Sequence, residues 1–151
     1  MSETCFISPS PLLKHWQAHR ELTRRVIEAF PEDKLFTFSV GGMRPFGEMA
    51  MEPLTMAVPT VQGVLSGNWH MAGREKITKS ELLRRWDENT AEIDVLWPQI
   101  PAARFSEKMT TFGQWPGVAH DIILRDRQRN SPSRAGVCVF ARTRNRAARL
   151  L

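Results

Sequence analysis

Apolar residues recur at steps of three and four over long segments of the chain, which is the spacing of one face of an α-helix. The first segment runs from about Pro11 to Phe30 and stops at Pro31. Its stripe consists of Leu12, Trp16, His19, Leu22, Val26, Ile27 and Phe30. A later segment opens with Thr78-Lys79-Ser80-Glu81, the pattern of a capping box, and ends before Pro98. Its stripe consists of Leu82, Leu83, Trp86, Ile93, Leu96 and Trp97. Both segments are therefore predicted to be amphipathic helices.

A third helical segment lies between these two, from about Pro45 to Leu65. Proline suits the first turn of a helix, where its missing N–H has no partner to lose. Pro53 and Pro59 are less suitable, because an interior proline removes a hydrogen bond and crowds the preceding turn at a cost of about 3 kcal/mol. We expect a kink or break near one of them. The segment 35–40 before this helix is predicted to be an extended linker.

The last part of the pattern is incomplete. Residues 98–117 form an irregular connection rich in proline and glycine, and a fourth helix is predicted to start near Pro116 and to reach Leu124. The apolar spacing then stops, and Ser131-Pro132-Ser133 would break any continuation. The predicted fold is all-α, an up-and-down four-helix bundle with a truncated last helix. The predicted division is a bundle domain, 1–124, and an Arg-rich tail, 125–151, without a stable fold of its own.

Charge is distributed unevenly along the 151 residues. The tail holds eight Arg and one acid, which gives +7, whereas residues 1–124 hold 13 basic and 15 acidic residues, which gives −2; together they make the net +5. A basic tail could bind nucleic acid nonspecifically, and a non-enzymatic interaction module of this kind is the alternative function. Because the excess charge is confined to a tail without fold, nucleic acid is not the expected partner.

Targeting signals are not evident in the sequence. There is no apolar run of 18 residues and no secretory signal at the N-terminus, so the expected location is cytoplasmic, with no membrane partner. Cys5 and Cys138 have no metal-binding spacing and are expected to be free thiols. No phosphate-binding loop, dinucleotide fingerprint or nucleophile elbow is present.

Several side chains could bind a metal. Glu48 and Glu52 lie four residues apart, on one side of the predicted second helix. A carboxylate in a helical bundle can ligate a metal, but it needs partners from other helices. The structural alternative is a solvated or paired carboxylate, and for Glu48 surface exposure is expected. His15 and His19 have the spacing of two imidazoles on one metal, although a contact at the edge of the core is the expected role of His19.

The two remaining histidines give weaker signals. His70 lies in a predicted loop with no partner nearby in the sequence, and His120, next to Asp121, lies at the start of the predicted fourth helix. Neither is expected to bind a metal.

Three blocks of sequence resemble the DinB-like (YfiT-like) family: HWQAHRELTRRVIEAFPEDKLFTFSVGGMRPFGEMAMEPL, ELLRRWDENTAEIDVLWPQIP and ARFSEKMTTFGQWPG. The resemblance implies a four-helix bundle with a bound divalent metal, Ni or Zn, commonly held by three histidines from two helices. It also implies a damage- or stress-inducible, thiol transferase- or hydrolase-like protein that acts on an unknown small molecule and forms a homodimer. Glu52 falls at the ligand position of the second helix, where histidine is commoner. Pro53 departs from the aliphatic residue expected there.

The tail departs from the family, whose members continue with a second ligand helix. With one choice of synonymous codons, residues 126–151 read one nucleotide later as Ile-Asp-Asn-Glu-Ile-His-His-Arg-Gly-Gln-Gly-Tyr-Val-Phe-Leu-Arg-Ala-Leu-Gly-Ile-Glu-Pro-Pro-Ala-Phe. This is a family-like ligand helix and its continuation. The sequence therefore predicts a frameshift at about Leu124 or Arg125. The metal partners of Glu52 would be lost with it, so this chain is expected not to bind the metal stably.

Overall fold

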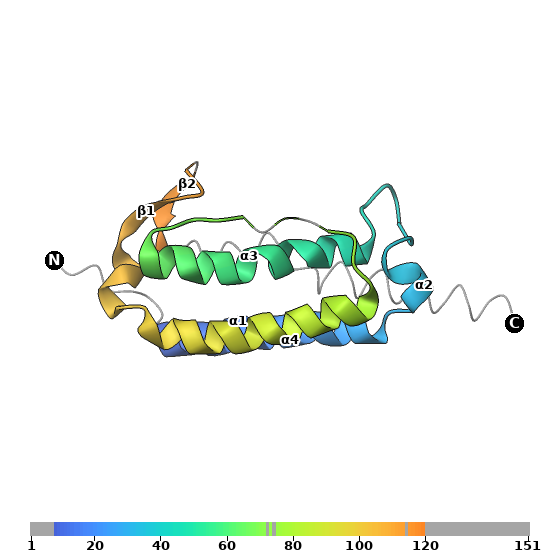
Figure 1. Ribbon diagram of the computed structural model, residues 1–151, viewed down its shortest axis with the longest axis horizontal. Coiled ribbons are helices and arrows are strands. Elements are labelled where there is room, and N and C mark those ends of the chain that lie inside the picture. Colours follow the sequence, from blue (N-terminus) through green and yellow to red (C-terminus); the bar gives the residue numbers. More distant parts are fainter. Residues whose placement is uncertain (1–7, 72, 74, 114, 120–151) are drawn as a thin grey trace, which may run out of the picture.

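The computed structural model describes residues 8–119 except 72, 74 and 114. Three long helices dominate it: α1 (Pro9–Ala29), α3 (Phe46–Ser66) and α4 (Lys79–Leu96) (Figure 1). The shorter elements are α2 (Glu32–Leu35), the 3-10 turns η1 (Trp97–Gln99) and η2 (Ala102–Ser106), and the strands β1 (Lys108–Thr111) and β2 (Trp115–Val118).

The three long helices pack into a bundle in which α1 runs antiparallel to both others (Figure 1). Hydrogen bonds between α1 and its neighbour α4 show that these two helices run in opposite directions. The Gln17 side chain donates to Asp94, near the end of α4, at 3.0 Å. At the other end, the Lys79 ammonium donates to the carbonyls of Glu28 and Phe30 at 2.7 and 2.8 Å. The helices α3 and α4 run parallel, so their connection, 67–78, returns along the bundle.

The core consists of two apolar clusters along the bundle. One lies towards the hairpin and contains Leu12, Trp16, Ala57, Val58, Val61, Val64, Ile93, Trp97, Ile100, Phe105 and Ala119. The other lies towards α2 and contains Ile27, Phe30, Leu35, Phe46, Ala50, Met51, Leu54, Leu82 and Trp86. Each of the three long helices contributes to both clusters, which is why they form one bundle.

The start of α4 confirms the N-cap role of Thr78 in the predicted capping box. The Thr78 hydroxyl accepts a hydrogen bond from the Glu81 backbone N–H at 3.2 Å, which satisfies one of the free donors of the first turn. The stripe of α1 is only partly as predicted. Leu22 is half exposed, whereas Arg20 and Thr23 are buried in its place. Residues 32–35 form the short helix α2, so Leu35, predicted to begin the extended linker, is helical.

The helix α3 continues without a break through Pro53 and Pro59, so of the two disruptions expected there the break does not occur. Packing is the physical reason. Besides Phe46 and Pro53, seven apolar side chains of this helix are buried between its neighbours, and each burial of a large side chain contributes about 1.5–3 kcal/mol, which outweighs the cost of an internal proline. They are Ala50, Met51, Leu54, Ala57, Val58, Val61 and Val64.

The hairpin of β1 and β2 corrects the predicted start of the fourth helix near Pro116. Pro116 lies opposite Thr110 in this antiparallel pair, so no helix starts there. Phe112 and Gly113 have positive φ angles of 48° and 70° and form the turn. The remainder of the predicted helix, 120–124, and the Arg-rich tail lie outside the described residues. Within the described part of the chain, no helix is long and apolar enough to span a membrane.

The clearest ion pair between helices joins Arg24 of α1 to Asp87 of α4. Arg24 Nε lies 2.6 Å from Asp87 Oδ1 and Nη2 lies 2.9 Å from Oδ2, which is a bidentate geometry. The hydrogen bond from Arg24 lowers the pKa of the Asp87 carboxyl. A depressed carboxyl pKa contributes stability above the unfolded-state value of about 4, and this contribution is lost as the pH falls through the folded-state value.

We expect Asp87→Asn to lower the free energy of unfolding by less than about 1 kcal/mol at pH 7, because the Asp87 side chain is 54% exposed to solvent. The difference from the parent should shrink progressively as the pH falls from about 5 to about 1, because the carboxyl of the folded chain is then protonated as well. Urea denaturation at pH 7 and across this acid range measures this. Glu28→Gln is the control, since Glu28 is 62% exposed and meets the same arginine at 3.3 Å, and it should have a smaller effect. A difference that persists at low pH would contradict the assignment to this pair.

Candidate functional site

Glu52 is a half-buried carboxylate on the second turn of α3. Its Oε1 atom lies 2.5 Å from Nη1 of Arg44, and its side chain is 23% exposed. Arg44 comes two residues before the helix starts at Phe46, and this places it within reach of Glu52. The hydrogen bond with Glu52 raises the pKa of the Arg44 guanidinium. The predicted ligand is therefore the anionic half of an ion pair in the structure.

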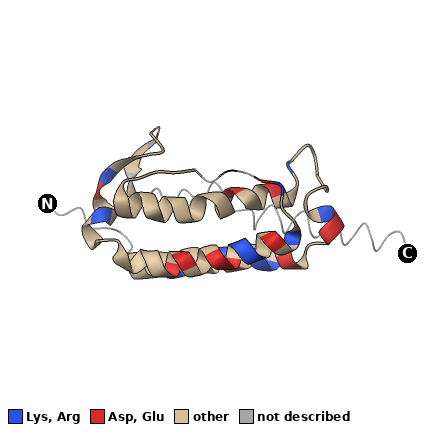
Figure 2. Cartoon of the chain, viewed as in Figure 1, with Lys and Arg blue, Asp and Glu red and all other residues tan. Residues whose placement is uncertain are grey.

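Glu48 lies one turn earlier on α3 and is exposed, as expected from the sequence. The charge of Glu48 also raises the pKa of Arg44, although less than Glu52 does. Figure 2 shows that these two carboxylates are the acidic side chains of α3, both near its start. One arginine from the preceding loop, Arg44, lies beside these two carboxylates, so the start of α3 is a local cluster of charge.

The described histidines do not form a metal-binding group with these two carboxylates. His15 and His19 lie on α1 with their ring centroids 4.8 Å apart, and His70 is exposed in the connection 67–78. His120 and Asp121, like Cys5 and Cys138, lie outside the described residues. Among the described side chains, no three His, Cys, Asp or Glu residues are close enough together to hold a metal ion.

The residues around Glu52 can be tested directly against a metal site. A Zn²⁺ ion in a protein is held by three or four anionic or neutral protein donors. In the described part of the chain, no group of three possible donors lies together around Glu52, and Glu52 pairs with a cation, the Arg44 guanidinium. The described residues therefore do not fit a complete metal site.

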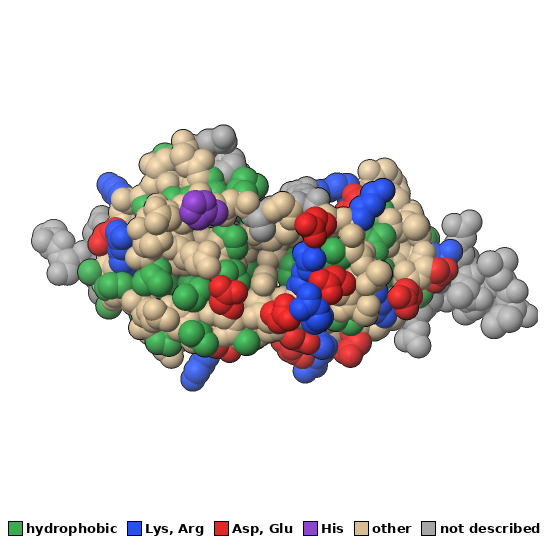
Figure 3. Space-filling view, in the orientation of Figure 1, with side chains coloured by type: hydrophobic (Ala, Val, Ile, Leu, Met, Phe, Trp, Pro, Cys, Tyr) green, Lys and Arg blue, Asp and Glu red, His purple; other side chains and the backbone are tan. Residues whose placement is uncertain are grey.

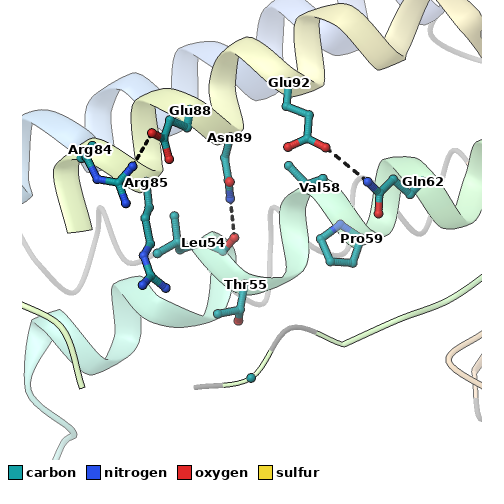
Figure 4. A pocket seen from close by; sticks show the side chains of 11 residues that line it. Leu54, Thr55, Val58, Pro59, Gln62, Arg84, Arg85, Glu88, Asn89 and Glu92 are labelled. Atoms are coloured by element: carbon teal, nitrogen blue, oxygen red, sulfur yellow. Dashed lines mark hydrogen bonds and ion pairs between the residues drawn. The ribbon is translucent and has the colours of Figure 1, made fainter. Parts of the chain in front are cut away.

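A pocket of about 480 Å³ lies elsewhere, between α3 and α4 (Figure 4). Its apolar surface comes from Leu54, Val58 and Pro59. The Asn89 side chain donates to the Leu54 carbonyl at 2.6 Å, and Gln62 donates to Glu92 at 3.2 Å, so polar contacts tie the two helices together beside the apolar surface. Glu52 does not line this pocket. The apolar spacing could not predict this pocket, because its residues come from two helices and a loop.

Charged side chains of both signs surround this pocket. Figure 3 shows them as an alternating band across the middle of this face. Arg84 and Arg85 line the pocket and pair with Glu81, whose pKa they lower to about 2 by hydrogen bonding. Glu88 pairs with Arg84 in turn. Because opposite charges are balanced within the band, the pocket has no strong preference for an anion or a cation.

This chain is similar to known proteins in its fold. No model of a known protein family matches the sequence, and no curated protein does. Among solved structures, the DinB-like protein YjoA from Bacillus subtilis matches with a TM-score of 0.69 and 12% identity, over 89% of this chain and 92% of YjoA. Mycothiol-dependent maleylpyruvate isomerase matches with a TM-score of 0.64 and 12% identity, over 91% of this chain and 62% of the isomerase.

A histidine-to-alanine variant of the same isomerase matches with a TM-score of 0.62 and 11% identity, over 84% of this chain. The chain spans 60% of the length of that protein. The fold is therefore that of a helical bundle of the DinB-like type, which confirms the fold class that the sequence resemblance implied. In the described residues this bundle differs from a simple up-and-down order in one connection, 67–78, which makes α3 and α4 parallel.

Proposed function

We propose that this chain is a DinB-like, stress-associated protein of a metal-dependent, thiol transferase- or hydrolase-like type, in which Glu52 is one ligand of a Ni²⁺ or Zn²⁺ ion in the intact form. The observation that supports this most is the half-buried position of Glu52 on α3, within a fold shared with YjoA and a mycothiol-dependent isomerase. Carboxylate oxygen is a suitable ligand for either ion.

The chain as it stands is proposed not to hold this ion stably. The partners of Glu52 would be an aspartate and two histidines that appear when residues 126–151 are read one nucleotide later, and these residues lie outside the described part of the chain. Without such partners, the guanidinium of Arg44 balances the Glu52 carboxylate instead. The Arg44–Glu52 ion pair is then what remains of the site on α3.

The DNA sequence across codons 120–151 tests the frameshift, since it must contain the shifted codons. A protein with its frame restored after Leu124 tests the site. We expect this protein to be purified with about one Ni or Zn per chain, because a complete donor set binds such ions tightly at neutral pH, whereas the present chain should contain less than about a tenth of that. Elemental analysis of both purified proteins gives these ratios.

Two substitutions in the restored protein distinguish the role of Glu52 from that of the nearby carboxylate Glu48. Glu52→Gln removes an anionic ligand and should reduce the metal content, whereas Glu48→Gln, one turn earlier and exposed, should not. Stoichiometric, tightly bound Ni or Zn in the present chain that Glu52→Gln removes would contradict the proposed loss of the site. A restored protein without metal would contradict the metal-dependent assignment itself.

A further inference from the structure

We infer that His15 and His19 form a separate two-histidine binding site for a borderline-soft divalent metal on α1. The two residues are four positions apart in a continuous helix, and their ring centroids lie 4.8 Å apart with an interplanar angle of 88°. Positions i and i+4 of a helix lie one above the other on the same face. His15 is exposed and His19 is half-buried, so the pair can be reached from solvent. This site is independent of the proposed function, because it shares no residue with Glu52.

The separation of the rings agrees with a shared metal ion. An imidazole nitrogen binds Zn²⁺ at about 2.0–2.1 Å, and the ring centroid lies about 1.1 Å further back, so each centroid would be about 3.2 Å from the ion. With an angle of about 90–110° at the metal, the two centroids would be about 4.5–5.2 Å apart. The observed 4.8 Å falls in this range, so chelation requires rotation of the imidazoles but no change in the helix.

The two imidazole ligands determine which metal ions this site can bind. Neutral imidazoles suit Cu²⁺, Ni²⁺ and Zn²⁺, whereas Mg²⁺ and Ca²⁺ prefer oxygen ligands. Among the first group, Cu²⁺ should bind most tightly by the general order of divalent affinities. Two protein ligands leave the other coordination positions to water. Because the imidazoles converge only when α1 is helical, bound metal should also stabilise the folded chain.

The test uses the full chain with Cys5→Ser and Cys138→Ser, which remove the thiols as competing ligands, and titrates it with Cu²⁺ by calorimetry. We expect about one equivalent of Cu²⁺, with hyperfine coupling to two imidazole nitrogens in its electron paramagnetic resonance spectrum. His15→Ala and His19→Ala should each weaken binding by about tenfold or more, and His19→Gln should do the same while keeping a larger side chain. Both alanine variants should fold, since alanine favours the helix.

His70→Ala is the matched control, because His70 is an exposed histidine away from α1, and it should change the affinity less than about twofold. Glu52→Gln should likewise leave Cu²⁺ binding unchanged, which separates this site from the one on α3. Affinity equal to that of the parent in either His15→Ala or His19→Ala would overturn the inference. So would a loss of binding in His70→Ala as large as in those two variants.

Discussion

Replacing Trp86 with alanine should lower the free energy of unfolding by about 3–5 kcal/mol, which is a large part of the stability of a domain of this size. Trp86 is 1% exposed and is the largest side chain that the bundle buries almost completely. It belongs to the apolar cluster towards α2, where α1, α3 and α4 meet. Alanine would leave a cavity there that rigid helices on three sides cannot close.

Arg20 increases the expected effect of this substitution. Its guanidinium carbon lies 4.7 Å from the centre of the Trp86 ring, and its Nη2 atom donates to the Trp86 carbonyl at 3.4 Å. Arg20 is only 4% exposed, so the ring provides part of the surroundings of a buried positive charge. Loss of the ring would leave that charge in a less favourable site.

Denaturation in urea, followed by circular dichroism, measures this change. Trp86→Phe keeps most of the ring volume and should cost clearly less than Trp86→Ala. Val95→Ala on the same helix is the control, because Val95 is 65% exposed and its loss should change the stability by no more than about 0.5 kcal/mol. Equal effects of Trp86→Ala and Val95→Ala would show that α4 is not packed as described.

The prediction of this buried contact from sequence was only partly successful, for a physical reason. The apolar spacing correctly identified α1 and the place of Trp86 on α4. It assigned Leu22 to the core because it counted apolar residues only. A long arginine side chain can lie along apolar surface and place its charged end on an aromatic ring, and neither property is visible in a hydrophobic pattern.

The length of the connection 67–78 indicates that α3 and α4 run parallel. Twelve residues in extended form span roughly 40 Å, whereas the 21 residues of α3 span roughly 31 Å, so the loop can return along the whole helix. A turn between antiparallel helices would need far fewer residues. The hairpin 108–118 had a weaker signal, since Pro116 argued for a helix start although it lies in a strand of a two-stranded pair.

The site was predictable in one residue and not in its partner. The spacing of charges and the family resemblance both pointed to Glu52, and the structure places it half-buried on α3. Its pairing with Arg44 depends on how residues before the helix fold back, which a helical pattern does not describe. The further ligands that the resemblance implies would follow residue 124, where the sequence departs from the family and which lies outside the described residues.

Gly47→Ala should be the second most damaging of the substitutions considered, at about 1–3 kcal/mol. A Cβ atom at this position would lie 2.5 Å from the Phe36 ring and 2.9 Å from the Leu35 carbonyl oxygen. The ring can rotate, but the carbonyl belongs to the backbone where α2 ends, so α2 and α3 would have to separate. The better helix propensity of alanine, up to about 1 kcal/mol, offsets only part of this cost.

Gly73→Ala is the matched control for this substitution, because a Cβ atom there would have no neighbour within 4 Å. We expect its unfolding free energy to stay within about 0.5 kcal/mol of the parent. Urea denaturation of both variants gives the comparison, and Gly47→Ala combined with Phe36→Ala adds a further test. Removal of the ring relieves the contact at 2.5 Å but not the one with the carbonyl, so the double variant should recover only part of the loss relative to Phe36→Ala alone. Complete recovery would assign the close contact to the ring, and the tight approach of α2 to α3 would then be a matter of side chains alone.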